Sequence, residues 1–122
     1  MRDAESAATY LASDNRTGEV VGALLIRRHY PESAEIHLLA VDPQLHRRGV
    51  GRALVEAVER DLVASGARML QVKTLGPSYR DEHYARTLAF YRAMVFVPLQ
   101  ELNDLWPDNP CLILVKSLAT SR

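Results

Sequence analysis

The chain lacks several features that would assign it to a class at once. It has a single cysteine, Cys111, so no disulfide forms within it. Its 15 basic and 15 acidic residues cancel, which disfavours a general nucleic-acid binder because such proteins present a net basic surface. No apolar run approaches the length of a membrane span, and residues 1–8 contain no signal-peptide core. We therefore expect a cytoplasmic protein without a membrane or nucleic-acid partner.

Residues for metal binding and thiol chemistry are also scarce. His29 and His83 have no partner at metal-ligand spacing, so no metal site is expected and both are assigned to the surface. Cys111 opens the apolar run CLILV, and this context favours a buried structural thiol over a reactive nucleophile.

What the chain does have is the composition of an ordinary folded protein. Hydrophobic residues make up 48% and charged residues 25% of its 122 residues. A chain of this length builds one hydrophobic core, and dividing it would leave two marginal halves. Residues 1–122 are therefore expected to form one domain.

Turn residues separate apolar runs along the first half of the chain. The runs at 7–13, 19–30 and 34–41 are β-leaning and predict a three-stranded antiparallel meander. From 49 to 65, apolar residues recur every four positions, which predicts an amphipathic helix, and Gly66 is expected to close it in the left-handed conformation.

The second half alternates strands and one helix. The predicted elements are a strand at 68–75, a helix at 82–94, a strand at 96–101 and a strand at 111–117. Because a helix separates the strands at 34–41 and 68–75, these two are expected to lie parallel. The order βββαβαββ predicts an α+β fold around a mixed, mostly antiparallel sheet.

The segment VDPQLHRRGVGRAL, residues 41–54, joins a strand end to a helix start through a basic turn that contains two glycines. The first turn of a helix has unpaired backbone N–H groups and a partial positive charge, and glycine lets a ligand approach the backbone closely. Arg47, Arg48 and Arg52 flank these groups. The expected ligand is a polyanion, and a pyrophosphate fits best.

Two common pyrophosphate motifs fail on spacing. A dinucleotide-binding fingerprint needs a third glycine where this chain has Leu54, and no G-K-[ST] of a P-loop is present. The remaining pattern is R/Q-x-x-G-x-G/A after a strand that ends in A-V-x-P. It resembles the GNAT superfamily of N-acetyltransferases, and the likeness runs from about residue 34 to 116 through the strand EIHLLAV, the turn and the helix segment AFYRAM.

The resemblance implies an acyl-CoA N-acyltransferase-like fold in which the turn holds the pyrophosphate of acetyl-CoA. It also implies that the pantetheine arm pairs with the main chain at the end of the strand. The residues that it assigns to coenzyme binding are Leu39, Ala40, Val41, His46, Arg47, Arg48, Gly49, Val50, Gly51 and Arg52.

The chain departs from the family pattern in three places. His46 replaces the usual glutamine or arginine, and because imidazole titrates near neutrality, phosphate affinity is expected to weaken as pH rises. Val95 replaces a glycine after the second helix, which is therefore expected to end differently. Only six residues precede Ala7, so the family's first strand and helices are expected to be missing. The acceptor side would then be open, filled by a second copy in a homodimer, or altered in function.

Tyr91 matches the tyrosine that the family uses as an acid toward the departing thiolate. A phenol titrates at about 10 and a thiol at about 8.5, so proton transfer between them is feasible. Spacing alone favours a core role, because Tyr84, Leu88 and Tyr91 share one helical face. The resemblance favours the catalytic role.

Two residues compete for the role of the base that deprotonates the amine. Strand alternation places Glu35, His37, Leu39 and Val41 on one face of the strand. Glu35 aligns with a glutamate that some relatives use, and His37 titrates near neutral pH. A solvated sheet face and a base supplied by water are the remaining alternatives.

The sequence thus predicts an N-acetyltransferase that moves an acetyl group from acetyl-CoA directly to an amine of a small molecule or protein. The alternative is a non-catalytic acyl-CoA-binding or protein-interaction module on the same scaffold. A weaker alternative is an RNA-contacting domain that uses the arginines of the turn.

Overall fold

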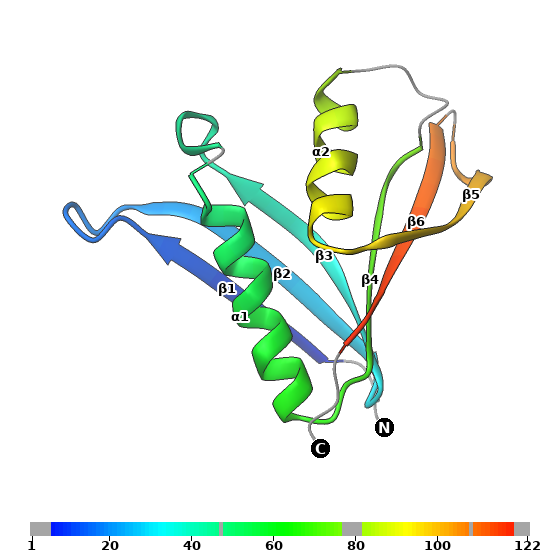
Figure 1. Cartoon of the computed structure of the whole chain (residues 1–122), viewed down its shortest axis with the longest axis horizontal. Helices are drawn as coiled ribbons and strands as arrows, with labels where there is room; N and C mark the ends of the chain where they lie inside the picture. The colour runs from blue at the N-terminus through cyan, green and yellow to red at the C-terminus, as the bar shows by residue number, and fades with distance from the viewer. Residues whose placement is uncertain (1–5, 47, 77–81, 108, 119–122) are drawn as a thin grey trace. The chain divides into compact units, whose positions relative to one another are not determined.

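The computed structural model describes residues 6–46, 48–76, 82–107 and 109–118, and within them six strands and two α-helices follow one another in the predicted order βββαβαββ (Figure 1). The predicted α+β class is confirmed. Contacts divide the chain into two units. Unit 1 comprises Met1–Leu70 with Leu118–Arg122, and unit 2 comprises Gln71–Ser117.

Unit 1 begins with the predicted meander. Strands β1 (Ser6–Ser13), β2 (Val20–Tyr30) and β3 (Ser33–Val41) pair antiparallel in the order β1-β2-β3. Between β1 and β2, the Asp14 carboxylate accepts hydrogen bonds from the N–H groups of Arg16 and Thr17. The turn composition that predicted a hairpin therefore acts through side-chain bonds to the backbone.

Helix α1 (Val50–Ala64) crosses one face of this meander (Figure 1). Its buried residues Leu54, Val58 and Leu62 recur every four positions, as predicted. Gly22 of β2 lies below the helix start, where a Cβ atom would come within 3.0 Å of Val50 Cγ1. The absence of a side chain on Gly22 thus lets the first turn of α1 approach the sheet.

Polar contacts fasten the last turns of α1 to the sheet. The Tyr10 hydroxyl donates to Asp61 Oδ2 at 2.6 Å, and the Arg28 guanidinium donates to Ser65 Oγ at 2.6 Å and to the Ser65 carbonyl at 3.1 Å. Gly66 has φ +93°, and the Ala67 N–H donates to the Leu62 carbonyl at 2.8 Å. The left-handed cap predicted at Gly66 is confirmed.

Two irregularities in the pairing of β2 with β3 change which side chains share a face. Leu25 pairs with Leu38 and Ile26 pairs with Ile36, so His37 is an extra residue on β3. Arg28 pairs with Ala34 and Tyr30 with Ser33, so His29 is an extra residue on β2. Glu35 lies between these two bulges.

The bulge at His37 makes the predicted alternation along β3 wrong. Residues that pair directly across antiparallel strands lie on the same face, and Leu39 and Val41 pair with Leu24 and Gly22 on the face that α1 covers. Glu35 pairs with Arg27 and therefore lies on the opposite face. An inserted residue shifts the period of two by one, and the sequence gives no signal of the insertion.

The remaining strands lie in the order β4-β6-β5, with bounds β4 (Met69–Leu75), β5 (Val97–Trp106) and β6 (Asn109–Ser117), and all of them but the first two residues of β4 belong to unit 2. Strand β5 runs five residues beyond its predicted end. Trp106 pairs with Asn109, so the segment around Trp106, which lies outside both predicted strands, belongs to a β5–β6 hairpin. Cys111 of β6 is buried, as predicted.

Helix α2 (Glu82–Ala93) ends in the same way as α1 although it has valine where α1 has glycine. Val95 has φ +73°, its N–H donates to the Arg92 carbonyl at 3.0 Å, and the Phe96 N–H donates to the Tyr91 carbonyl at 2.9 Å. These bonds form a Schellman cap. The expectation that this helix ends differently was wrong, because its cap bonds hold a β-branched residue in the left-handed region.

Over the residues that the structure describes, no helix is long and apolar enough to cross a membrane.

Candidate functional site

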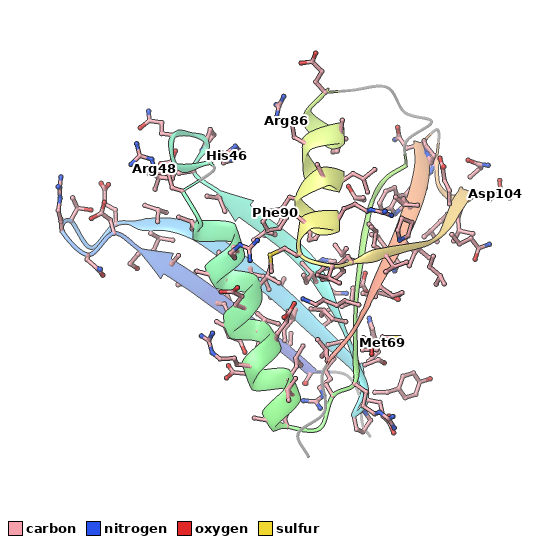
Figure 2. All side chains as sticks on the ribbon, in the orientation of Figure 1. His46, Arg48, Met69, Arg86, Phe90 and Asp104 are labelled. Carbon is pink, nitrogen blue, oxygen red and sulfur yellow. The ribbon has the colours of Figure 1, made fainter. Side chains whose placement is uncertain are left out.

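The turn between β3 and α1 is built by short-range hydrogen bonds. The Asp42 carboxylate accepts from the Gln44 N–H at 3.0 Å and caps a single 3-10 turn, Pro43–Leu45. Gly49 then takes φ +84°, a backbone conformation that residues other than glycine rarely adopt, and α1 begins at the next residue. Figure 2 shows His46 and Arg48 on this turn.

The first turn of α1 has the features of an anion site. Its first intrahelical bond runs from the Ala53 N–H to the Gly49 carbonyl at 2.9 Å, so the N–H groups of Val50, Gly51 and Arg52 have no intrahelical acceptor. Among the described residues, neither a side-chain cap nor an acidic residue occupies this first turn. The N–H groups and the positive end of the helix dipole are thus available to an anion.

Arginine side chains flank this helix start. Arg48 is exposed on the turn, and Arg52 approaches Glu56 with an N–O distance of 3.5 Å. Both side chains of that pair are about half exposed, so the pair is weak and an anion can compete for the guanidinium. Arg47, which the sequence also assigns to this site, lies outside the described residues.

His46 is oriented by its own strand. Its Nε2 lies 3.0 Å from the Val41 carbonyl oxygen. A carbonyl only accepts, so Nε2 carries the hydrogen and donates it. The remaining nitrogen, Nδ1, can donate to a phosphate only when the imidazole is protonated.

The three residues that the sequence assigns to the pantetheine arm end β3. Leu39 and Val41 are half-buried on the face toward α1, and Ala40 is exposed on the opposite face. The main chain of all three pairs with β2, from Leu24 to Gly22.

Glu35 is the buried titratable group of this strand. Only 8% of the residue is exposed, and its Oε1 lies 2.7 Å from Nε2 of His29. His29, which the sequence analysis assigns to the surface, is half-buried beside Glu35. A signal existed in retrospect, since both residues lie near the hairpin that joins β2 to β3, but the bulge that directs His29 toward Glu35 has no signature in sequence. His37 is exposed at its own bulge.

Tyr91 belongs to unit 2 and is 4% exposed. Its ring meets Phe90 and Phe96 edge to face, with centroids 5.2 and 5.3 Å apart. Burial raises the pKa of its phenol to about 12.

These residues fall into two groups. Unit 1 holds Glu35, His29, the end of β3 and the first turn of α1, and unit 2 holds Tyr91. Within the described part of the chain, His, Cys, Asp and Glu side chains form no cluster of three or more that could hold a metal ion.

A family model described as the Acetyltransferase (GNAT) family matches residues 1–94. No curated protein matches the chain significantly. Among solved structures, an acetyltransferase of the GNAT family from Desulfovibrio desulfuricans has a TM-score of 0.79 at 23% identity, over 93% of this chain and 69% of its own.

Two further structures give similar values. The ribosomal-protein-S18-alanine N-acetyltransferase of Escherichia coli has a TM-score of 0.78 at 19% identity, over 95% of this chain and 72% of its own. An aminoglycoside 6′-N-acetyltransferase in complex with coenzyme A has a TM-score of 0.72 at 18% identity, over 95% and 75%. These likenesses confirm the predicted acyl-CoA N-acyltransferase-like fold with its mixed sheet.

Proposed function

Because the chain belongs to the GNAT family of acetyltransferases, we propose that it is a cytoplasmic N-acetyltransferase that moves the acetyl group of acetyl-CoA directly to an amine of a small molecule or protein. The observation that most strongly supports acetyl-CoA binding is the uncapped first turn of α1. It presents backbone N–H groups between exposed arginines, which suits a diphosphate.

In this proposal the coenzyme extends from the turn along β3. The diphosphate accepts hydrogen bonds from the N–H groups of Val50, Gly51 and Arg52, with Arg48 and the Arg52 side chain supplying charge. Gly51 keeps the approach free of a Cβ atom. A Cβ at Gly49 would meet nothing within 4 Å, so the role of Gly49 is conformational. The pantetheine arm pairs with the main chain from Leu39 to Val41.

The reaction forms one bond and breaks one. The amine nitrogen attacks the thioester carbonyl, the C–N bond forms, and the C–S bond breaks. One amine proton passes to a base, and the departing thiolate gains one proton. A base therefore limits the positive charge that develops on the amine nitrogen, and an acid limits the negative charge that develops on sulfur.

For the acid we propose Tyr91. Its pKa of about 12 keeps the phenol protonated throughout the physiological range, so it is always ready to donate a hydrogen bond. The transfer of that proton to a thiolate is uphill, because a thiol is the stronger acid. Tyr91 therefore acts by donating a hydrogen bond that stabilises the negative charge on sulfur, and the thiolate takes its proton from water after it leaves.

For the base we propose Glu35, with His37 and water as the alternatives. Glu35 is buried and hydrogen-bonded, whereas His37 is exposed on a bulge. Comparison of pH–rate profiles for Glu35→Gln and His37→Ala separates them. The variant that loses the acidic limb of the profile identifies the base, and retention of that limb in both assigns the step to water.

The proposal is tested by thermal melting with acetyl-CoA and by release of free thiol with a panel of amines. At 100 times the Kd, ligand binding stabilises the fold by about 2.7 kcal/mol, which raises Tm by about 10 °C for a chain of this size. The double variant Arg48→Gln/Arg52→Gln is expected to lose most of this shift. Arg60→Gln, an exposed arginine farther along α1, is the matched control and is expected to keep it.

Three outcomes are distinct. A Tm shift together with amine-dependent thiol release supports the enzyme. A shift without release for any amine supports the non-catalytic acyl-CoA-binding module instead. No shift at saturating acetyl-CoA contradicts both.

A further inference from the structure

Glu35 occupies an unusual position in the meander of unit 1. It lies between two bulges of opposite strands, and each bulge inserts a histidine: His29 in β2 and His37 in β3. A bulge redirects the side chain of the inserted residue. Only one of the two histidines reaches Glu35, because His29 Nε2 lies 2.7 Å from Glu35 Oε1.

The two partners differ in exposure. The Glu35 side chain is 10% exposed and that of His29 is 32% exposed. A carboxylate removed from water loses hydration that favours its ionised form, and a hydrogen bond donated to one oxygen restores part of that stabilisation. The bond also fixes the carboxylate about its terminal torsion, which is otherwise broad.

We propose that His29 is a positioning residue that holds Glu35 ionised and oriented for deprotonation of the acceptor amine; this inference rests on the acetyl transfer proposed above. His29 donates its Nε2 hydrogen to Oε1, and the Glu35 carboxylate takes the amine proton. Glu35 is then a neutral carboxylic acid whose Oε1 still accepts from His29. Release of that proton to water after product departure returns the pair to its starting state.

This role makes specific demands on the residue at position 29. A donor must be present where Nε2 lies, but it need not titrate. The amide nitrogen of glutamine reaches about as far along the side chain as Nε2 of histidine, whereas the amide nitrogen of asparagine matches Nδ1. His29→Gln should therefore preserve the bond to Glu35, and His29→Asn and His29→Ala should lose it.

The test compares steady-state kinetics of these variants with Glu35→Gln and the double variant His29→Ala/Glu35→Gln. We expect kcat to fall about 10- to 100-fold in His29→Ala and His29→Asn, the range that misplacement of a catalytic group produces. KM for acetyl-CoA should stay unchanged, because the coenzyme turn is separate from the pair. His29→Gln should retain kcat within about threefold of wild type, and the double variant should be no slower than Glu35→Gln alone.

A spectroscopic measurement on the unliganded protein tests the bond itself. Long-range ¹H–¹⁵N spectra should show His29 protonated at Nε2, and Glu35→Gln should shift the His29 signals but leave those of His37 in place. Melting curves of each variant separate a lost interaction from a lost fold, and His29→Gln covers the case in which His29→Ala fails to fold.

The result that overturns this inference is an active wild-type enzyme in which His29→Ala keeps full kcat, or in which its effect adds to that of Glu35→Gln. An asparagine variant as active as the glutamine variant contradicts it as well. If the wild type releases no thiol with any amine, the proposed function itself is wrong, and the role of His29 falls with it. The two failures are therefore distinguishable in one experiment.

Discussion

The cap of α2 offers a quantitative test, because Val95 has the backbone conformation of a glycine. Its φ of +73° costs a β-branched residue about 2–3 kcal/mol relative to glycine. Val95→Gly removes this strain. The substitution also has two costs. It loses the buried part of a side chain that is 67% exposed, which contributes about 0.7 kcal/mol, and it raises the conformational entropy of the unfolded chain, which costs about 0.7 kcal/mol.

The balance predicts that Val95→Gly stabilises the protein by about 1 kcal/mol, which raises Tm by about 3–5 °C. Gly66→Val is the matched reciprocal change at the same position of the α1 cap. A Cβ at Gly66 meets nothing within 4 Å, so this variant isolates the backbone cost and should lose about 2 kcal/mol.

Calorimetry or urea unfolding at neutral pH measures both variants. An unchanged or lower Tm for Val95→Gly, together with the expected loss for Gly66→Val, would show that the Val95 side chain contributes more than its exposure implies. If Gly66→Val were also neutral, the assigned cost of the left-handed conformation would be wrong for both caps.

Three further predictions address the site and its support. Tyr91→Phe should lower kcat about 100-fold with coenzyme affinity nearly unchanged in steady-state assays. Because burial raises the Tyr91 pKa to about 12, the pH profile of the wild-type kcat should show no descending limb near pH 10. His46→Ala should raise the Kd for CoA in calorimetric titration, because it removes the hydrogen bond from Nε2 to the Val41 carbonyl that orients the ring on the turn. Burial and the bond to Asp61 raise the Tyr10 pKa from 10.0 to about 12. The stability that Tyr10 contributes to the fold is therefore complete below pH 10 and is lost as pH rises through 12, so Tyr10→Phe should flatten the alkaline decline of Tm in this window.

Regular patterns made much of the fold predictable. In α1, the four-residue spacing of Leu54, Val58 and Leu62 and the terminal Gly66 report directly on burial and on backbone conformation. The turn before α1 was predictable for a similar reason, because glycine next to arginine at a helix start has few other physical explanations. Local rules determine these features, and local rules can be read from a sequence.

The wrong predictions share a different cause. At each of these positions the conformation or the partner of the residue is determined by another strand or by the bonds of a helix cap. The extra residue His37 reverses the face of Leu39 relative to Glu35, and only the pairing with β2 reveals it. His29 meets Glu35 for the same reason. Valine has a low propensity for the left-handed conformation, but two cap bonds, donated by the N–H groups of Val95 and Phe96, hold Val95 in it. Nonlocal pairing and stored strain thus limit prediction from sequence at these positions.

The central claim is that the first turn of α1 binds the diphosphate of the coenzyme through its backbone. Titration of the ¹⁵N-labelled protein with CoA tests it most directly, because each amide reports separately. We expect the largest shifts on saturation to fall on the N–H groups of Gly49, Val50, Gly51 and Arg52. Saturable binding that leaves these four amides in place and shifts others would contradict it.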